Sequence, residues 1–513
     1  MYCSIMSGAL VGVQAYMVSV EVDVARGLPG FSMVGSLSGE VRESKERVQV
    51  ALKNVGMNLP PTHITVNLSP ADRRKEGTAF DLPIAVGMLQ AFGYFGEKAT
   101  EGTLFLGELG LNGEIKPVKG VLPIVREAAR RGFRQCIVPS ENAKEGAIIP
   151  DITVRGVSDI QKLLLFLQYS CEGKKKEMEE LLPEEIVDME SAFSVQTEWE
   201  YDFAQVNGQE TAKRAAEIAA AGFHNLLMVG PPGAGKSMIA RRIPGILPPL
   251  TLEESLEVTS IMSVAGLLPE EGLVTTRPFR NPHHTISQAA FTGGSMTPRP
   301  GMISQAHRGV LFLDELPEFQ RSVIDSMRQP LEEKQVRISR NNGSVSYPAD
   351  FMLVCAMNPC PCGYYPNHSR CQCTQAQVKR YTSKVSGPIL DRMDLCVELQ
   401  SVDIMDISST GQSEDSTSIR ERVMVARRIQ ERRFAGTGIR FNADMEPQEL
   451  EKYCQLGIQE RKCAEDLYRS LQLSARSYHR LLRVARTIAD LSEEEKIKKE
   501  HLMEAACYRP TLE

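Results

Sequence analysis

Residues 230–237 read GPPGAGKS and fit the spacing G-x-x-x-x-G-K-[ST]. In this pattern the glycines let backbone N–H groups surround phosphate oxygens, the lysine neutralises the β and γ phosphates, and the serine hydroxyl binds Mg²⁺. The segment follows the apolar run NLLMVG and precedes the helical sequence MIARRI, as the motif requires. We therefore predict an ATP and Mg²⁺ site, rather than a glycine-rich turn, formed by Gly230, Pro231, Pro232, Gly233, Ala234, Gly235, Lys236 and Ser237.

Two further apolar runs end in polar residues. GVLFLDEL contains Asp314 and Glu315, and FMLVCAMN ends in Asn358. Ligands of parallel α/β sheets bind at the carboxyl ends of the strands, where these side chains would meet. We expect Asp314 to hold Mg²⁺ through water and Glu315 to polarise the attacking water. Asn358 would help to position that water, the alternative being a residue that only caps its strand.

Four cysteines crowd into the sequence that follows Asn358. Cys360, Cys362, Cys371 and Cys373 have the spacing C-x-C-x₈-C-x-C. Four thiolates suffice for a closed tetrahedral Zn²⁺ site, which would be structural because no coordination position remains open. The alternative is a set of reduced thiols that pack a loop. In either case we expect the segment to stiffen the chain after Asn358 and not to be the reaction centre.

Length and composition limit the class of protein. A chain of 513 residues is too long for one core, and its net charge of −6 gives no overall attraction to nucleic acid. The sequence has no run of 18 consecutive apolar residues, so no membrane span is predicted. The N-terminal sequence lacks the basic region of a signal peptide. Twelve cysteines without an exported context favour a reducing compartment. We expect a cytoplasmic protein.

The pattern along the chain predicts a multidomain α/β protein. Residues 1–170 read as a mixed α+β domain, with a half-buried strand at 18–24 (VSVEVDV) and a helix that ends at Gly56. Residues 171–200 form a charged linker, and 201–400 alternate strand, loop and helix, with the cysteine loop at 360–373. A polar linker at 401–420 precedes a helical region at 421–513. There one helix face carries Leu481, Leu482, Val484, Ala485, Ile488 and Leu491.

Two segments could present positive charge to a polyanion. The 42 residues from Gly272 to Leu313 contain no Asp or Glu, but they contain Arg277 and Arg280. This interval either forms a DNA-binding surface or avoids repulsion near ATP. The sequence EKQVRISRNNGSVSYP predicts a hairpin with a turn at NNG. Its side chains Lys334, Arg337 and Arg340 could bind phosphates without reading sequence.

Taken together, GPPGAGKS, RPFRNPHHT, AHRGVLFLDEL, AMNPCPCG and SGPILDRMD resemble the ComM/YifB group of magnesium-chelatase-like AAA+ ATPases. The resemblance covers essentially the whole chain. It implies a P-loop AAA+ core with a parallel sheet flanked by helices, an N-terminal Lon-protease-like domain of ribosomal-S5-like fold, and a C-terminal helical lid. It also implies a hexameric ring that moves branched DNA during recombination of incoming strands, as in natural transformation.

The resemblance assigns several residues. Arg392 in GPILDRMD matches the arginine finger that reaches a neighbouring subunit, and Arg476 in LSARSYHR matches the second sensor, which reads the nucleotide of its own subunit. The hairpin would point into the pore of the ring. In the Lon-like domain, KEGTA places Ala79 where the peptidase has its nucleophilic serine, so Lys116 or Lys119 would be a base without its partner.

These observations lead to one main functional hypothesis. The chain would be an ATP-hydrolysing translocase or branch-migration helicase, a homo-oligomer that acts on single-stranded or branched DNA with ATP and Mg²⁺ and with a structural Zn²⁺ as an option. The alternative is a chelatase-type or protein-remodelling motor that acts on a protein partner. An ATP-dependent protease is disfavoured by Ala79.

Overall fold

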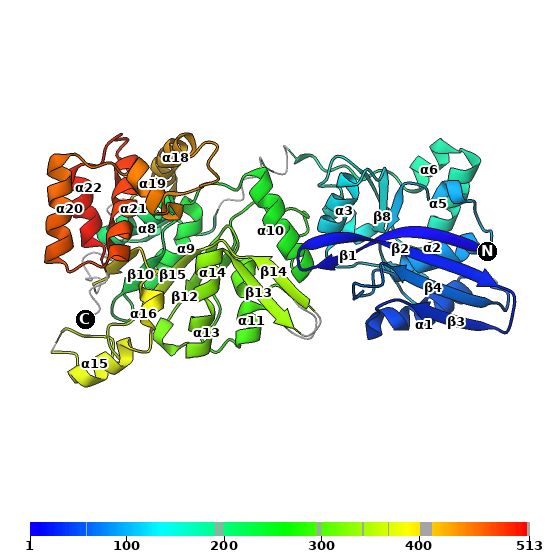
Figure 1. The fold of residues 1–513 in the computed structure, drawn as a ribbon, viewed down its shortest axis with the longest axis horizontal. Helices are drawn as coiled ribbons and strands as arrows, with labels where there is room; N and C mark the ends of the chain where they lie inside the picture. The colour runs from blue at the N-terminus through cyan, green and yellow to red at the C-terminus, as the bar shows by residue number, and fades with distance from the viewer. Residues whose placement is uncertain are drawn as a thin grey trace. The chain divides into compact units, whose positions relative to one another are not determined.

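The structure, a computed structural model, describes residues 1–57, 59–189, 193, 199–294, 299–340, 343–367, 369–400 and 413–509. The chain forms two compact units (Figure 1). We call residues 1–195 and 255–275 the N-terminal unit, and residues 196–254 and 276–513 the C-terminal unit. Each unit has its own sheet and its own hydrophobic core.

A seven-stranded mixed sheet organises the N-terminal unit, in the order β3-β4-β2-β1-β5-β8-β9. The alternation predicted at residues 18–24 is confirmed, because Val18, Val20 and Val22 are fully buried within strand β2. Helices α1 (Gly39–Asn54), α2 (Asp81–Ala91), α3 (Val121–Arg130) and α5 (Ile160–Glu172) complete the unit. The strands are β1 (Tyr2–Val11), β2 (Gln14–Ala25), β3 (Gly30–Val34), β4 (His63–Ser69), β5 (Thr103–Phe105), β8 (Gln135–Pro139) and β9 (Thr153–Val157).

The compact units do not follow the predicted boundaries. The start of the expected linker folds as helix α6 (Lys175–Leu181), and the next residue, Leu182, is buried in the core of the N-terminal unit. Residues 255–275, which include most of helix α10 (Leu252–Ala265), also belong to this unit. There Leu273 joins an apolar cluster, and the Ser263 hydroxyl donates a hydrogen bond to the buried carboxyl of Glu145.

A five-stranded parallel sheet organises the C-terminal unit, in the order β11-β12-β15-β10-β16. The three apolar runs predicted as buried strands are confirmed as β10 (Leu226–Val229), β12 (Val310–Leu313) and β15 (Met352–Met357), in which every residue is buried. Edge strands β11 (Phe279–Arg280) and β16 (Leu395–Glu398) complete the sheet. The side chains on the two faces of this sheet belong to two separate apolar clusters. One of these clusters also contains side chains of helices α8 (Glu210–Gly222) and α9 (Lys236–Ile246).

Helices follow the sheet to the end of the chain. The predicted helix face is confirmed in α21, where Leu481, Leu482, Val484, Ala485 and Ile488 are buried in the same cluster as α8 and α9. Helix α18 begins at Ser416, where the Asp415 side chain accepts from the N–H of Ser418; part of the predicted polar linker is therefore helical, and residues 401–412 lie outside the described residues. The helices are α18 (Ser416–Arg433), α19 (Pro447–Tyr453), α20 (Ile458–Ser470), α21 (Ala475–Leu491) and α22 (Lys499–Cys507).

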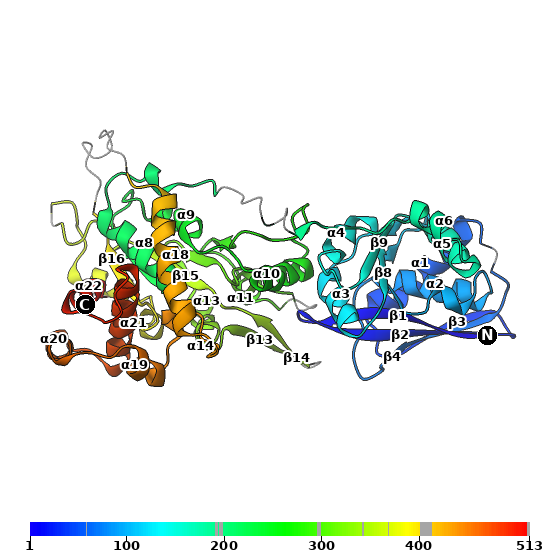
Figure 2. The ribbon, with the colours of Figure 1, turned by 90° about the horizontal axis from the view of Figure 1, so that it is seen from above.

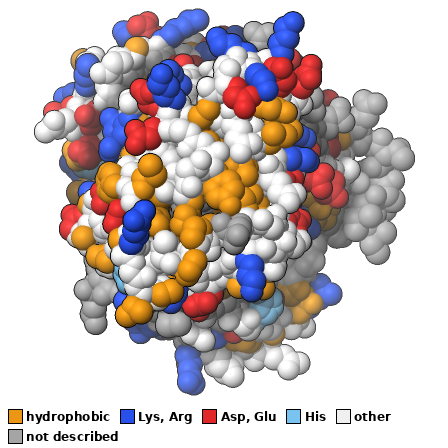
Figure 3. Space-filling view, turned by 90° about the vertical axis from the view of Figure 1, so that its right-hand side faces the viewer, with side chains coloured by type: hydrophobic (Ala, Val, Ile, Leu, Met, Phe, Trp, Pro, Cys, Tyr) orange, Lys and Arg blue, Asp and Glu red, His pale blue; other side chains and the backbone are white. Residues whose placement is uncertain are grey.

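The surface shows where apolar groups remain uncovered. On the face drawn in Figure 3, hydrophobic side chains gather near the middle and charged side chains lie mostly around them. The N-terminal unit exposes several large apolar side chains, among them Met1, Tyr2, Leu28 and Ile186. Within the described ranges, no helix combines the length and the hydropathy that crossing a bilayer would need.

Candidate nucleotide site

The predicted nucleotide residues follow three neighbouring strands of one parallel sheet. Strand β15 lies between β10 and β12, with Val229 opposite Met357 and Leu313 opposite Cys355. The GPPGAGKS loop, the Asp314–Glu315 pair and Asn358 therefore leave the sheet at the same edge. The sequence predicted these residues at the carboxyl ends of strands, and the fold brings them together as expected.

The loop at 230–235 has open space beside two of its glycines. Gly233 and Gly235 adopt the left-handed conformation, with φ of 79° and 90°, and an added Cβ at either would meet no atom within 4 Å. Gly230 is different, because its Cβ would lie 2.7 Å from the carbonyl oxygen of Leu399. Two glycines thus keep the phosphate side open, while the third allows close packing against the chain that leaves β16.

Lys236 opens helix α9 and is 9% exposed. Its ammonium group donates to the carbonyl oxygens of Gly230 at 2.6 Å and Pro231 at 2.9 Å, and to Oδ1 of Asn358 at 3.0 Å. Burial lowers the pKa of Lys236, and the carboxylates of Asp314 and Glu315 oppose that shift. The ammonium therefore connects the phosphate loop to the end of strand β15.

Ser237 and Asp314 form the second link across the site. The Ser237 hydroxyl donates a 2.6 Å hydrogen bond to Oδ2 of Asp314, and the N–H of Glu315 donates to Oδ1 at 3.0 Å. A hydroxyl and a carboxylate are the oxygen ligands that Mg²⁺ prefers. Glu315 has a φ of 52°, and its side chain is 58% exposed. One acid is thus held against the phosphate loop, while the next faces solvent.

A polar cavity of about 370 Å³ adjoins these residues. Glu315 and Asn358 line one part of it, and Arg380 and Tyr381 of helix α15 (Gln375–Thr382) line another. No sequence pattern in α15 indicates that this helix lies beside the strand ends, so its part in the cavity was not predicted.

His284 lies beside Glu315, a contact that no sequence pattern indicated. Its Nδ1 lies 3.6 Å from Oε2 of Glu315, and its ring packs against that of His283, with centroids 4.1 Å apart and the ring planes tilted by 33°. The histidines stood within the motif RPFRNPHHT, but no spacing tied them to the distant acid.

Comparisons with known proteins agree with this geometry. Residues 202–407 match the family model described as magnesium chelatase, subunit ChlI; residues 20–142 match subunit ChlI of Mg-chelatase; and residues 413–509 match the ChlI C-terminal model. The chain is 42% identical over 505 residues to competence protein ComM of Haemophilus influenzae, covering 98% of this chain and 96% of that protein. It is also 42% identical over 503 residues to YifB of Salmonella typhimurium, with the same coverage. The chain belongs to the ComM/YifB family of magnesium-chelatase-like AAA+ ATPases.

A shorter similarity connects this ComM/YifB chain to a chelatase subunit. The magnesium-chelatase 38 kDa subunit of Rhodobacter capsulatus is 26% identical over 188 residues, which cover 33% of this chain and 53% of that protein. The N-terminal and C-terminal parts of the chain each match family models of their own. The five-stranded parallel sheet is accordingly the AAA+ core of the chain.

The two arginines assigned from the family resemblance meet at one carboxylate. Arg392 contacts Oε1 of Glu332, at the end of helix α14 (Arg328–Glu333), and Arg476 lies 3.7 Å from the same oxygen. The Arg392 side chain is 10% exposed, and that of Arg476 is 53% exposed. Both arginines pair with Glu332 and not with the phosphate loop of their own chain, so these contacts do not support the expectation that Arg476 reads the nucleotide of its own subunit.

The predicted hairpin is present. Strands β13 (Gln335–Arg340) and β14 (Gly343–Pro348) pair antiparallel, and they project from the sheet of this unit (Figure 2). Arg337 is 53% exposed and pairs with Glu333 at 3.2 Å. The side chain of Arg340 and the turn residues 341–342 lie outside the described part of the chain.

Two of the basic residues predicted to contact DNA have other partners. Arg277 is buried and donates to Glu254 at 3.1 Å and to the carbonyl oxygen of Arg308 at 2.6 Å. Lys334 caps helix α14 and pairs with Asp350 at 3.3 Å and with Asp444. Burial opposes its charge, but the two carboxylates outweigh burial and raise the pKa of Lys334. The expectation of DNA contact is therefore wrong for Arg277, and Lys334 is engaged inside its own unit.

The position of Arg280 does not decide whether this residue contacts DNA. It lies in edge strand β11, opposite Leu311, and is partly buried. Burial lowers the pKa of Arg280. The acid-free interval thus supplies the strand beside β12, which agrees better with the alternative that it avoids repulsion near ATP.

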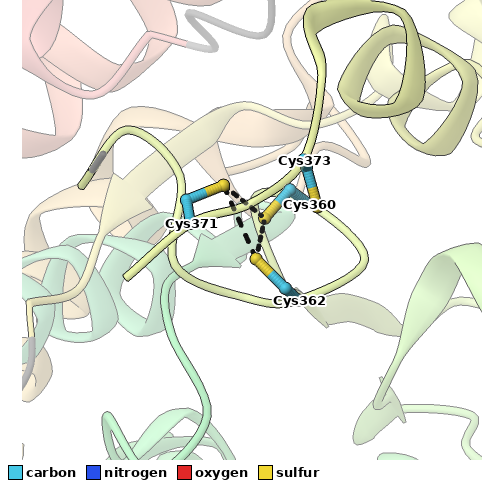
Figure 4. Close-up of side chains that lie close together, drawn as sticks. All are labelled: Cys360, Cys362, Cys371 and Cys373. Atoms are coloured by element: carbon cyan, nitrogen blue, oxygen red, sulfur yellow. Dashed lines mark hydrogen bonds between the residues drawn. The ribbon is translucent and has the colours of Figure 1, made fainter. Parts of the chain in front are cut away.

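The four predicted cysteines converge (Figure 4). Their Sγ atoms all lie within 4.8 Å of one another. The separations are 3.4 Å for Cys360–Cys362, 3.5 Å for Cys362–Cys371 and 3.8 Å for Cys360–Cys371. The backbone N–H of Tyr364 lowers the pKa of Cys362 to about 6. All four are free thiols, so the spacing C-x-C-x₈-C-x-C forms a cluster without a disulfide.

The N-terminal unit lacks the groups of a serine–lysine peptidase at the expected positions. Ala79 is half-buried and offers no nucleophile, and Lys116 and Lys119 are exposed. The buried lysine of this region is Lys75. That proteolysis is disfavoured stays a prediction.

Proposed function

We propose that this AAA+ ATPase is a motor that moves DNA, working as a hexameric ring that migrates branches during recombination of incoming strands. ATP is the fuel and Mg²⁺ its counter-ion. Zn²⁺ bound by the four cysteines is structural. The Lon-like N-terminal unit serves as a non-proteolytic scaffold, and the C-terminal helices serve as the lid of the nucleotide site.

The position of the hairpin in the chain carries this proposal. It lies between β12, whose end bears Asp314 and Glu315, and β15, whose end bears Asn358. Val336 and Tyr347 anchor the base of the hairpin, since both are buried. A shift of either strand end during hydrolysis would therefore move the hairpin that separates them in sequence.

The charge on the hairpin supports a polyanionic substrate. Arg337 exposes about half of its side chain, and its carboxylate partner Glu333 is 40% exposed, so the pair can open to a phosphate at small cost. Contacts of this kind bind backbone phosphates and do not read bases. With Arg277 and Lys334 engaged elsewhere, Arg337 and Arg340 are the hairpin candidates that remain.

The two arginines at Glu332 support a ring in which subunits share nucleotide sites. Arg392 and Arg476 gather two positive charges at one carboxylate. A phosphate of a neighbouring subunit's nucleotide could replace that carboxylate as their partner. Arginine fingers supplied in trans stabilise the charge of the phosphoryl-transfer transition state.

A chelatase-type motor that acts on a protein partner is the second candidate. It is favoured by the 26% identity to the magnesium-chelatase 38 kDa subunit, although that similarity covers only a third of the chain. The two candidate functions differ in whether the protein must bind DNA. A protein-remodelling motor would have no need of a basic hairpin.

Steady-state ATP turnover with and without DNA separates these functions. We expect forked or single-stranded DNA to raise turnover of the full-length protein several-fold at low salt. Turnover that ignores every nucleic acid at low salt, with Arg337→Gln and Arg340→Gln equally active, would rule out the DNA motor. Release of peptides from an unfolded protein would instead support the protease, which Ala79 argues against.

A further inference from the structure

The cysteine loop touches the nucleotide loop directly. Gly363, the residue after Cys362, has a φ of 86°, and a Cβ added there would lie 2.5 Å from Cδ of Pro232. The same Cβ would lie 3.8 Å from Cγ of Asn358. The backbone between the second and third cysteines is thus packed against the second proline of GPPGAGKS and beside the amide that bonds Lys236.

The chain that leaves the cysteine loop forms the wall of the catalytic cavity. Cys373 is followed by Thr374, which caps helix α15 in a capping box with Gln377. Two turns later Arg380 and Tyr381 line the cavity that contains Glu315 and Asn358. The cysteine loop therefore borders the nucleotide site both through Gly363 and through α15.

The backbone of this loop forms turn hydrogen bonds, among them Gly363 N–H to the carbonyl oxygen of Cys360 and Cys371 N–H to that of Asn367, and the four thiols converge inside it. In its described part, between Asn358 and Thr374, it contains neither helix nor strand. Of the four cysteines only Cys360 is buried, so hydrophobic packing is slight. Four thiolates around one metal would tie the two ends of the loop together, a constraint beyond that of its local turn hydrogen bonds.

The sulfur positions suit Zn²⁺. Zn–S bonds of about 2.3 Å in a tetrahedron place the sulfurs about 3.8 Å apart. The separations among the sulfurs of Cys360, Cys362 and Cys371 are 3.4, 3.5 and 3.8 Å, and the sulfur of Cys373 lies within 4.8 Å of the others. A disulfide would need about 2.05 Å. The cluster already has nearly the geometry of a metal-bound set.

We propose that Zn²⁺ bound by Cys360, Cys362, Cys371 and Cys373 holds Gly363 against Pro232, so that nucleotide binding by the ATPase depends on the metal. This inference rests on the ATP site of the proposed function and not on DNA. When the metal leaves, the cysteine loop loosens, Pro232 loses its support, and α15 loses its fixed start. Phosphate binding must then also order a loop that zinc would have held in place, and this ordering lowers the affinity for nucleotide.

The first test removes the metal from the full-length protein. Cys371→Ser combined with Cys373→Ser should lose one zinc per chain, measured by mass spectrometry, and should bind a fluorescent ADP about tenfold to hundredfold more weakly. Cys171→Ser combined with Cys507→Ser is the matched control, because both cysteines are exposed and lie outside the cluster. A zinc-free double variant with unchanged ADP affinity would overturn the proposal, as would a parent protein that holds no zinc.

A second variant separates the effect of the Gly363–Pro232 contact from the effect of zinc binding. Gly363→Ala keeps all four cysteines, so zinc content should remain at one per chain while ADP affinity falls, because the new Cβ collides with Pro232. Gly436→Ala controls for backbone strain, since Gly436 has a φ of 77° and no atom within 4 Å of an added Cβ. Equal ADP affinity in the two variants would refute the contact.

The remaining outcomes are also decisive. If the double cysteine variant does not fold, the Gly363→Ala comparison and chelation of the folded parent decide between the outcomes. If DNA fails to stimulate turnover while zinc loss still weakens ADP binding, the DNA motor is wrong and this inference stands. If the parent binds zinc but no nucleotide, the ATP site itself is wrong.

Discussion

Each of the two sheet units contains a buried lysine whose ammonium group donates to backbone carbonyls of its own loop, but we propose a phosphate site at only one of these loops. In the N-terminal unit, Lys75 is fully buried, and its ammonium donates to the carbonyl oxygens of Pro70 and Arg73. In the C-terminal unit, Lys236 donates to Gly230 and Pro231 in the same way. Burial lowers the pKa of both ammonium groups.

The surroundings of the two lysines differ. Lys236 also donates to Asn358 at the end of a neighbouring strand, and its loop has open space at Gly233 and Gly235. The backbone of Lys75 instead joins that of Ser36 and Ser38, and its side-chain partners are backbone carbonyls of its own loop. A buried lysine thus becomes a ligand-binding group only when its loop leaves room for a ligand and a second polar element faces it.

Replacing each lysine by alanine tests this comparison. Lys236→Ala should reduce ATP turnover by roughly 10²-fold or more, because a preorganised charge at the phosphates is lost. Lys75→Ala should leave the turnover of folded protein unchanged, but it should lower the free energy of unfolding of the N-terminal unit by about 1–3 kcal/mol. Turnover assays and chemical denaturation measure the two effects.

The opposite pattern would break the comparison. If Lys75→Ala removed turnover without unfolding, the N-terminal loop would take part in catalysis. If Lys236→Ala kept turnover, the phosphate loop would not be the site. A matched exposed control is Lys116→Ala, which should change neither quantity because Lys116 is exposed.

Two acids beside the same cavity allow a finer test within the C-terminal unit. Glu315→Gln should keep nucleotide affinity while turnover falls by roughly 10²–10⁴-fold, because the amide cannot accept a proton from the attacking water. Glu318→Gln should have little effect, since Glu318 pairs with Lys384 on the exposed side of the cavity. Binding of fluorescent ATP and steady-state turnover separate affinity from chemistry. Equal losses in both variants would contradict the assignment of Glu315.

The nucleotide loop was predictable because its signals are local. Glycine spacing, an apolar strand before it and a helix after it all lie within about twenty residues of Lys236. The positions of Asp314, Glu315 and Asn358 followed from three apolar runs and the rule for parallel sheets. The cysteine cluster was equally local, with four thiols in fourteen residues.

The long-range partners of charged side chains were not predicted. Arg277 is buried against Glu254, which contradicts its predicted DNA contact. Lys334 pairs with Asp444, which is 110 residues away, but 43% of its side chain is exposed, and its DNA contact stays a prediction. No spacing rule connects such pairs. Likewise, the contact of Gly363 with Pro232 joins residues 131 positions apart, and only the folded chain reveals it. Local chemistry could be predicted, whereas the partner of a long charged side chain could not.

Substitution in the hairpin has the smallest expected effect, and it tests the predicted DNA contact of Arg337. Arg337→Gln should weaken DNA binding uniformly across sequences and reduce the slope of log affinity against log salt by about 0.9 per lost duplex-phosphate contact. Arg321→Gln is the control, because Arg321 on helix α13 (Arg321–Ser326) is 80% exposed but lies outside the hairpin. Fluorescence anisotropy across a salt series measures both slopes. If the two variants had equal salt slopes, Arg337 would contribute no more to DNA binding than any exposed arginine. Its position in the hairpin between β12 and β15 would then not support a DNA contact.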